Sequence, residues 1–179
     1  SSSGDLHGSD LIIHQIEIHS ASGDINLDEI HTEQLSMEVA SSDVHINKLS
    51  GNCEIKSASG DVRISKSYGK KLIYNNASGD LDIDGDYLYI KLNNVSGDVN
   101  AEFKTVEQMN VSTTSGDINI RIDNSDNLSI DTHSLSGDCD VYLKGKDVIT
   151  NRNQSVTIGE PNTPIKLNTV SGDIHLDMA

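Results

Sequence analysis

Aromatic residues and positive charges are both scarce in this chain. Among 179 residues there is no tryptophan, one phenylalanine and five tyrosines, which is a thin supply of the flat side chains on which sugar rings stack. Lysines and arginines number 13 against 28 aspartates and glutamates, for a formal net charge of −15. That charge repels phosphate backbones and attracts cationic peptides, polycations and divalent ions, so nucleic acid is not an expected partner.

Long hydrophobic runs are absent too. No stretch approaches the roughly 18 apolar residues that span a bilayer, and the chain does not open with the basic and then apolar segments of a signal peptide. We therefore expect no direct insertion of this segment into a membrane. Hydrophobic residues make up only 35% of the chain, so their spacing carries the information.

The tripeptide Ser-Gly-Asp, which occurs eight times, sets that spacing. Its glycines recur near multiples of a step of about nineteen residues, at Gly4, Gly23, Gly60, Gly79, Gly97, Gly116, Gly137 and Gly172. We interpret two segments without glycine as degenerate copies that fill the gaps: Ser41-Ser42-Asp43, and Asn153-Gln154-Ser155 followed by Val156-Thr157-Ile158. A different turn is expected at Ser42 and Gln154, where glycine is missing.

Each step contains two short alternations of apolar and polar residues, which predict two strands with one buried face each. The first follows the aspartate, with the inward pairs Ile25/Leu27, Val44/Ile46, Val62/Ile64, Leu81/Ile83, Val99/Ala101, Ile118/Ile120, Cys139/Val141, Val156/Ile158 and Ile174/Leu176. The second has the inward pairs Ile16/Ile18, Leu35/Met37, Cys53/Ile55, Leu72/Tyr74, Ile90/Leu92, Met109/Val111, Leu128/Ile130, Val148/Thr150 and Ile165/Leu167. A smaller residue before each triplet is interpreted as filling the corner: Ala21, Ala40, Ala58, Ala77, Val95, Thr114, Leu135 and Val170.

A unit of this size cannot close a core alone, so it must stack on its neighbours to remove both stripes from water. The sequence therefore predicts an all-β fold: a single-domain parallel β-solenoid, or β-helix, over residues 1–179, with about nine coils of roughly 19 residues each. Coils would lie ~4.8 Å apart, and each large aliphatic side chain buried contributes roughly 1.5 to 3 kcal/mol. Parallel crossovers are usually right-handed, although short coils include left-handed exceptions.

The repeat runs to both ends without a capping helix. Uncapped coil edges invite end-to-end self-association, and we expect the segment to be an excised part of a longer protein. Cys53 and Cys139 fall in inward columns about five coils apart. That is roughly 24 Å by the ladder spacing, too far for a disulfide between them.

The triplet has a structural explanation, because glycine adopts positive φ at a corner and Ser and Asp bond nearby backbone N–H groups. Its aspartates would form one column, in which like charges roughly 5 Å apart repel unless hydrogen bonds or cations compensate them. The column comprises Asp24, Asp43, Asp61, Asp80, Asp98, Asp117, Asp138 and Asp173. Calcium is the alternative reason for such a column, but each coil offers one carboxylate where calcium takes six to eight oxygens. No cofactor is expected.

A candidate contact patch is expected where Tyr87 and Tyr89 face outward beside Ile73 of the preceding coil. Such residues also occur on strands simply because they pack well across a sheet. The one notable basic cluster lies nearby and would equally guard against aggregation: Lys70, Lys71 and Lys91.

Enzymes must be weighed as well, because β-helices host polysaccharide lyases and hydrolases whose acid and base are carboxylates on adjacent coils. Asp82 and Asn100 are the nearest such neighbours here. The coils lack the long loops that build a cleft over a solenoid, so we do not expect an enzyme. The seven histidines lack the spacing of a zinc site and are mostly expected on the surface.

The repeated motif Ser-x-Ser-Gly-Asp-apolar-x-apolar, present as Ser20–Leu27 and Ser57–Ile64, resembles a bacterial family of domains of unknown function that is labelled as an adhesin. The resemblance covers nearly the whole chain and implies a β-solenoid without established catalytic residues. Members are often encoded with membrane-anchoring or envelope-stress modules, which implies work at the bacterial cell envelope or surface.

The function expected from these observations is that of a non-enzymatic surface module, which presents an acidic β-surface to proteins or cationic peptides. A calcium-stabilised structural rod is the alternative, with Asp24, Asp61, Asp80, Asp98, Asp117 and Asp138 as its metal ligands. A polysaccharide-active β-helix enzyme is the third reading.

Overall fold

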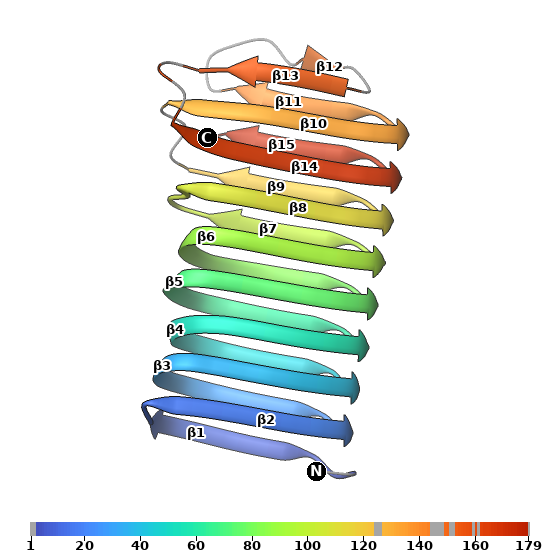
Figure 1. Ribbon diagram of the computed structural model, residues 1–179. Helices are drawn as coiled ribbons and strands as arrows, with labels where there is room; N and C mark the ends of the chain where they lie inside the picture. Colours follow the sequence, from blue (N-terminus) through green and yellow to red (C-terminus); the bar gives the residue numbers. More distant parts are fainter. Residues whose placement is uncertain are drawn as a thin grey trace.

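The computed structural model describes residues 3–123, 127–143, 149–150, 153–158, 160 and 162–178. These residues form no helix; their strands belong to a single sheet that winds into a flattened coil (Figure 1). The strands are β1 (Leu6–Ile12), β2 (Gln15–Ser22), β3 (Ile25–Ser41), β4 (Val44–Ser59), β5 (Val62–Ser78), β6 (Leu81–Ser96), β7 (Val99–Phe103), β8 (Gln108–Ser115), β9 (Ile118–Ile122), β10 (Leu128–Ser136), β11 (Cys139–Leu143), β12 (Ile149–Thr150), β13 (Asn153–Thr157), β14 (Thr163–Ser171) and β15 (Ile174–Met178).

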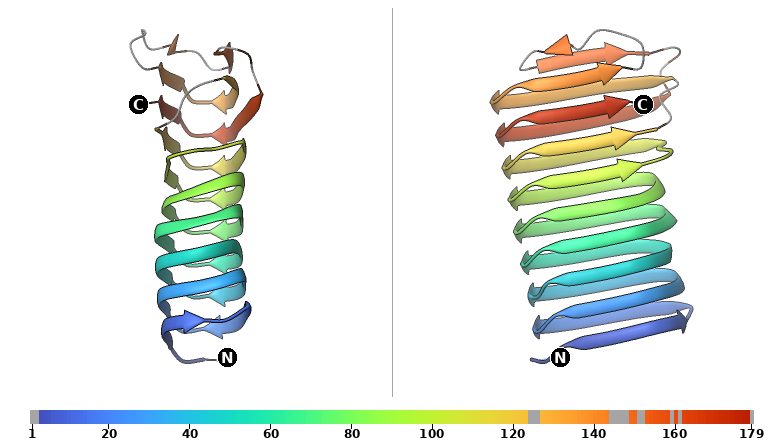
Figure 2. Two further views of the ribbon diagram at one scale, coloured as in Figure 1. Left: turned by 90° about the vertical axis from the view of Figure 1, so that its left-hand side faces the viewer. Right: turned by 180° about the vertical axis from the view of Figure 1, so that it is seen from behind.

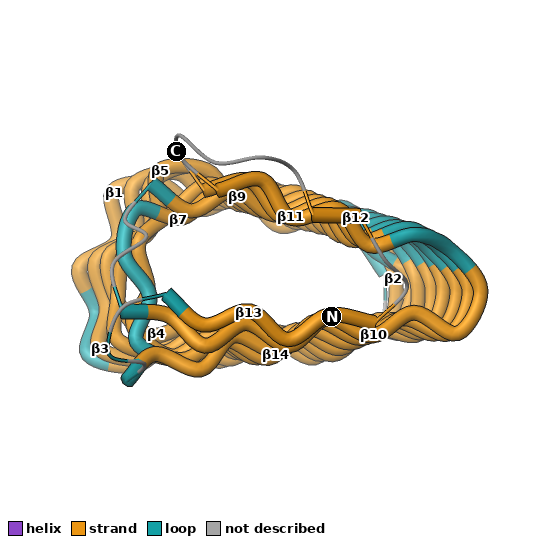
Figure 3. Tube along the Cα trace, turned by 90° about the horizontal axis from the view of Figure 1, so that it is seen from above, coloured by secondary structure: helices purple, strands orange, loops and turns teal. Residues whose placement is uncertain are grey.

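The coil has two long walls, which Figure 3 shows end-on. The long strands β3 to β6 bend round one end and contribute to both walls, whereas elsewhere shorter strands belong to one wall each. The front wall of Figure 1 also contains β2, β8, β10, β13 and β14, and the back wall contains β1, β7, β9, β11, β12 and β15. Seen from the front or from behind, the nearer strands among β1 to β9 run left to right as the chain climbs from its N-terminus, so the coil is right-handed (Figures 1 and 2).

Equivalent positions of neighbouring coils pair in parallel and in register. Ile25 pairs with Val44, Val44 with Val62, and Val62 with Leu81. The expected inward residues of β3 to β11, β14 and β15 are buried and form a shared apolar interior. The predicted parallel β-solenoid is therefore confirmed. One further expected pair cannot be placed, because the side chains of Val148 and Thr150 lie outside the described residues.

The expected count of nine coils in chain order is too high. About six turns of ~19 residues follow one another, from β1 to β8. Beyond them the order changes, because β14 lies between β8 and β10, and β15 lies between β9 and β11. The last described segment of the chain is thus inserted into the stack rather than added to its end (Figure 1).

The second degenerate copy is not a coil of the parallel stack. Its residues form β13, which pairs antiparallel with β10, so that Gln154 lies opposite Thr132 within a strand and not at a corner. Strand β12 pairs antiparallel with β11 in the same way. Val156 and Ile158 nevertheless pack against the core. The first degenerate copy is a corner as expected, and its turn differs, because Ser42 lacks the positive φ of the glycines.

The small residues before each triplet do not fill the corner. Val95, Leu135 and Val170 are exposed, as are the alanines of this column. The residue one position earlier points inward instead, because the alternation of the strand continues into the corner. This inward column is polar except at Val39: Ser20, Ser57, Asn76, Asn94, Thr113, Ser134 and Thr169 are buried. Except for Thr113, whose hydroxyl has no hydrogen-bond partner among the described residues, these polar side chains donate to carbonyls of the turns. Asn94 Nδ2, for example, donates to Gly79 O at 2.9 Å and to Gly97 O at 3.0 Å.

Cys53 and Cys139 are both buried and form no disulfide with each other, as the ladder spacing predicts. Burial raises the pKa of the Cys53 thiol to about 12 and also raises that of Cys139. Neither thiol is therefore ionised at neutral pH.

Candidate functional site

The aspartates of the triplets form a hydrogen-bonded ladder along one edge of the solenoid. In seven of the eight steps the Oδ1 of one aspartate accepts the backbone N–H of the aspartate on the next coil, for example Asp98 N–H to Asp80 at 2.8 Å; no such bond joins Asp43 to Asp24. The same bond, at 2.8–3.0 Å, links Asp24 to Asp5, Asp61 to Asp43, Asp80 to Asp61, Asp117 to Asp98, Asp173 to Asp117 and Asp138 to Asp173. The expected column is confirmed, and we call these nine residues the aspartate ladder.

Glycine is required beside this ladder for two reasons at once. At Gly97 φ is +118°, and a Cβ would lie 2.3 Å from the carbonyl oxygen of Gly79 on the coil below. At Gly97 the two coils therefore approach too closely for any side chain. This structural role is enough to explain why the triplet is repeated in nearly every coil.

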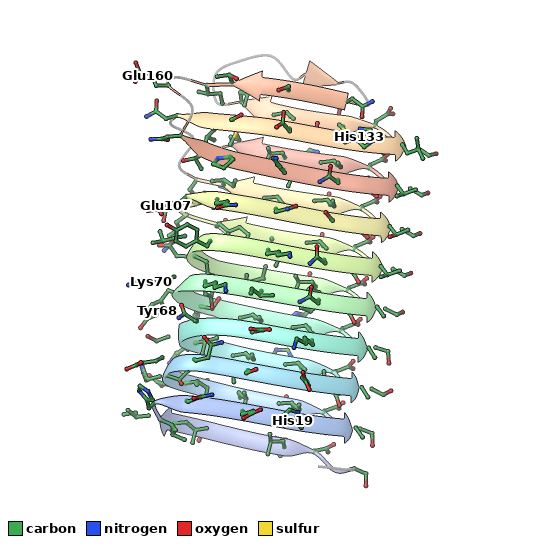
Figure 4. All side chains as sticks on the ribbon, in the orientation of Figure 1. His19, Tyr68, Lys70, Glu107, His133 and Glu160 are labelled. Carbon is green, nitrogen blue, oxygen red and sulfur yellow. The ribbon has the colours of Figure 1, made fainter. Side chains whose placement is uncertain are left out.

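The ladder does not have the geometry of a metal centre. Each carboxylate lies on its own coil, and seven of the nine already accept a backbone hydrogen bond. The described residues contain no group of three or more His, Cys, Asp or Glu that could hold an ion. The histidines of the described part form no such group either. His19, labelled in Figure 4, lies instead between Glu17 and Glu38, at 2.9 and 3.3 Å.

The outer surface of the back wall lies next to the aspartate ladder and consists of two columns of side chains. One column runs His7, Asn26, His45, Arg63, Asp82, Asn100, Asn119, His175 and Asp140. The other runs Ser9, Asp28, Asn47, Ser65, Asp84, Glu102, Arg121, Asp177 and Tyr142. We call these two columns the back face.

Part of the back face is hollowed into an open depression of about 460 Å³, which extends from Arg63 to Asp177. Arg63 contacts Asp82 at 2.8 Å, and Arg121 lies 3.7 Å from Glu102. Asp84 and Asp177 make no ion pair with any described residue. The depression therefore holds carboxylates that no cation of the described chain neutralises.

Asp82 and Asn100, the pair considered for acid and base chemistry, lie on this face as hydrogen-bonded neighbours. The Asn100 amide donates to Asp82 at 3.2 Å, and the Asn119 amide donates to Asn100 at 3.0 Å. These side chains form a ladder of amides and carboxylates along the wall. These hydrogen bonds fix the side chains of neighbouring coils relative to one another.

Negative charge is concentrated on this side of the molecule. The back face carries six carboxylates and two arginines, and the aspartate ladder beside it adds nine carboxylates. The outward residues of the front wall are balanced, with four acidic residues (Glu17, Glu38, Glu54 and Asp131) and four lysines (Lys56, Lys71, Lys91 and Lys166). The net charge of the chain is thus carried mainly by one face and one edge.

The expected contact patch is only partly present. Tyr89 is 47% exposed and Ile73 is half-buried, but the expectation that Tyr87 faces outward is wrong, because its side chain is fully buried. The strand turns a corner there, and the ring lies against Gly69 and Gly85, whose missing side chains make room for it. The alternation of inward and outward side chains in β6, counted back from Ile90, placed Tyr87 outside, but this alternation is lost at the corner.

Tyr89 and Ile73 lie among lysines on the front wall, where Lys71 pairs with Tyr89 and Ile73 with Lys91. A hydrogen bond to Glu107 raises the pKa of the Tyr89 hydroxyl. Sequence reasoning missed Tyr68, which is 54% exposed at the same side of the solenoid as Lys70 and Glu107 (Figure 4). It lies in a bend between the walls, where periodicity gives no signal.

Comparison with known proteins supplies a family. A family model described as Toastrack DUF4097 matches residues 1–65 and 51–177, which together make up nearly the whole chain. No curated protein and no solved structure matches the chain. The described residues contain no helix that is long and apolar enough to cross a bilayer.

Proposed function

The chain belongs to the Toastrack family of domains of unknown function, and we propose that it is a non-enzymatic interaction module that binds cationic peptides or the basic surfaces of proteins. The back face is the binding surface. The β-solenoid supplies a rigid scaffold, and the two columns supply the contacts.

The observation that carries this proposal is the unequal charge of the two walls. The back face and aspartate ladder together hold 15 carboxylates and two arginines, whereas the front wall is neutral. Clustered charge of one sign attracts ligands of the other sign and speeds their association. A cationic ligand is therefore directed to one side of the solenoid.

The shape of the back face favours an extended ligand. Its depression is open and spans several coils from Arg63 to Asp177, and side chains recur along it every ~4.8 Å. A lysine- or arginine-rich peptide lying along the columns would reach Asp84 and Asp177, which have no ion pair of their own among the described residues. Arginine would also reach the carboxylates in a bidentate manner.

A labelled arginine-rich peptide titrated with the protein tests the proposal. Replacing Asp84→Asn, Glu102→Gln and Asp177→Asn together should weaken binding about tenfold, because three exposed charge pairs contribute roughly 0.2–1 kcal/mol each. Binding should also weaken as salt is added. Fluorescence anisotropy measures both effects.

The matched control removes the same number of charges from the front wall through Glu17→Gln, Glu54→Gln and Asp131→Asn. This variant should bind the peptide nearly as well as the unchanged protein. Equal losses in the two variants would show that only net charge matters, and an unchanged protein that does not bind the peptide would refute the proposal.

We extend the proposal to place and role: the module acts at the bacterial cell envelope or surface, in the manner of an adhesin. The resemblance of the Ser-Gly-Asp motif to an adhesin-labelled family supports this. Fractionation of cells that express the full-length gene product is the test, and recovery of the protein only in the cytoplasmic fraction would refute it.

The calcium-stabilised rod remains the alternative. Of the features that it requires, the fold provides one, a column of stacked carboxylates. An ion bound only by the folded protein raises the melting temperature. A melting temperature that is the same in calcium and in chelator would remove this alternative.

A further inference from the structure

Three exposed aliphatic side chains lie together at the Ser-Gly-Asp corner. Beyond β2 they are the only large aliphatic residues of the described chain that are exposed rather than partly buried: Val95 at 54%, Val170 at 47% and Leu135 at 67%. The serines that follow them pair from coil to coil, through Ser96, Ser115, Ser171 and Ser136. This register stacks the three with Thr114, in the order Val95, Thr114, Val170 and Leu135. We call these four residues the apolar corner, which lies at the arrowheads of β6, β8, β14 and β10 (Figure 1).

The fold does not need large side chains at this position. On the lower coils the same column consists of exposed alanines: Ala21, Ala40, Ala58 and Ala77. Those coils turn the same corner, and their serines pair in the same register. Valine and leucine therefore give the upper coils an exposed apolar surface that alanine would avoid. A contiguous apolar surface rimmed by polar residues marks a contact with another molecule.

The two flanks of the apolar corner differ in charge. On one flank lies the upper part of the aspartate ladder, with Asp98, Asp117, Asp173 and Asp138. None of these carboxylates forms an ion pair with a described residue. On the other flank the outward residues of the front wall include no carboxylate and no lysine: Asn93, Ser112, Asn168 and His133. A ligand that covers the corner therefore meets negative charge on one side only.

The ladder determines which kind of partner fits this corner. Two copies of this chain that met through the apolar corner would bring their aspartate ladders together, and the like charges would repel. An anionic lipid surface is repelled for the same reason. A ligand whose apolar residues are flanked on one side by lysine or arginine is attracted instead. The partner is therefore amphipathic and basic along one flank.

The spacing of the column favours a helical partner. Its side chains recur every ~4.8 Å along the axis of the solenoid, at about 0, 4.8, 9.6 and 14.4 Å. In an α-helix that rises ~1.5 Å per residue, positions i, i+3, i+7 and i+10 lie at about 0, 4.5, 10.5 and 15 Å. The helix thus stays in step over all four coils. Side chains on one face of an extended strand recur every ~6.7 Å and fall out of step after one coil.

We propose that the apolar corner is a docking surface for a basic amphipathic α-helix of a partner protein. The helix lies parallel to the axis of the solenoid, with its apolar residues on Val95, Val170 and Leu135 and its basic flank over the aspartate ladder. Its other flank meets the uncharged residues of the front wall. This surface lies across the ladder from the back face, and it does not depend on the function proposed for that face.

Two synthetic peptides of about 18 residues, long enough to form a helix, test the proposal with the intact protein. The first has leucines at positions i, i+3, i+7 and i+10 and lysines along one flank. The second has the same composition in an order without an apolar seam. Fluorescence anisotropy should give a dissociation constant at least about tenfold lower for the first peptide, because only its leucines reach the apolar corner together. Circular dichroism should show that this peptide becomes helical on binding.

Replacing Val95→Thr, Val170→Thr and Leu135→Thr together should raise the dissociation constant of the first peptide at least about tenfold, because its leucines lose their apolar contacts. Threonine suits an exposed strand, and a thermal melt checks that the fold persists. Tyr68→Thr and Tyr89→Thr together are the matched control, because both side chains are exposed and lie near the opposite edge of the molecule (Figure 4). This control should bind the peptide as well as the unchanged protein.

The charge of the ladder is tested separately. Asp117→Asn and Asp173→Asn keep the acceptor oxygens of the ladder but remove two charges, and should weaken binding of the first peptide about threefold or more. The back-face variant with Asp84→Asn, Glu102→Gln and Asp177→Asn leaves the apolar corner and the ladder intact. It should bind the first peptide within about twofold of the unchanged protein, because its lost charges lie beyond the ladder and are screened by salt.

The proposal is wrong if the two peptides bind equally well, since charge alone would then explain binding. It is also wrong if the threonine variant binds the first peptide as the unchanged protein does, or if that peptide binds without becoming helical. Loss of binding in the back-face variant alone would assign the peptide to the back face and leave only the function proposed there. Sedimentation velocity that shows a dimer dispersed by the threonine variant would mean that a second copy covers the corner instead.

Discussion

At the scale of single residues, the Ser-Gly-Asp corner couples each coil to the next. The aspartate carboxylate accepts a backbone N–H from the adjacent coil, and the glycine allows two backbones to approach within the space of a side chain. The inward polar residues, such as Asn94, satisfy carbonyls of the same turn. The corner is thus a hydrogen-bonded seam along the whole stack.

Gly97→Ala should destabilise the fold by about 1–2 kcal/mol or more, because alanine resists positive φ and its Cβ would meet Gly79 O at 2.3 Å. Gly8→Ala is the control: Gly8 lacks positive φ, and its Cβ would touch only leucine side chains at 3.1 and 3.2 Å. The midpoint of urea unfolding measures both. Similar losses in the two variants would contradict the role given to the corner.

Asp98 separates the carboxylate's role as an acceptor from its charge. Asp98→Ala removes the acceptor of the Asp117 N–H, which lies 2.8 Å away, and should cost about 1–3 kcal/mol. Asp98→Asn keeps an oxygen there and relieves repulsion from Asp80 and Asp117, so it should be nearly as stable as the unchanged protein in urea. If the asparagine is as harmful as the alanine, the charge itself is needed, as a bound cation would require.

At the corners, the sequence predicted least well which side chains are buried and which are exposed. Two-residue alternation places the side chains of straight strands, and it predicts the burial of Ile25, Val44 and Val62. At one bend the alternation is lost, and Tyr87 turns inward over Gly85. At the triplet corner the alternation continues further than expected, so that the alanine column faces outward. Local bends depend on packing against neighbouring coils, which one coil's sequence does not contain.

At the scale of elements, the chain departs from its own order once. β14 and β15 occupy the level between β8/β9 and β10/β11. The sequence contains a hint of this, because 35 residues separate Gly137 from Gly172 without another glycine triplet. The repeat period alone cannot show where β14 and β15 are inserted, because coils that carry the same triplet could stack on one another in any order.

Deleting residues 162–179 tests this insertion through the two thiols. Cys139 lies in β11, which pairs with β15 in the intact chain, whereas Cys53 lies in β4, among coils that the deletion does not touch. Alkylation followed by mass spectrometry should show Cys139 reacting at least about tenfold faster after the deletion, because its burial is lost and its thiol ionises more easily. Cys53 should stay protected in both proteins.

Continued protection of Cys139 would contradict this expectation. It would mean that β10 and β11 close directly onto β8 and β9, in the order that the repeat alone predicts.

At the scale of the whole molecule, the negative charge is concentrated on the back face and the aspartate ladder. The aspartate ladder could be predicted, because its residues share one position in the repeat. The contrast between the walls could not be seen in single columns, since Arg63, Asp82 and Asn100 share no chemistry. The contrast appears only when the charges of both outward columns of each wall are added together. Assigning residues to those columns requires the register of every coil.

The insertion of β14 and β15 also has a consequence for biosynthesis. Coils β1 to β8 can stack one after another as a ribosome delivers them, since each contacts the one before. Residues 128–143 emerge next, yet their neighbours in the finished stack, β14 and β15, are made after them. The nascent protein must hold that place open, or exchange one pairing for another, until translation has passed Met178.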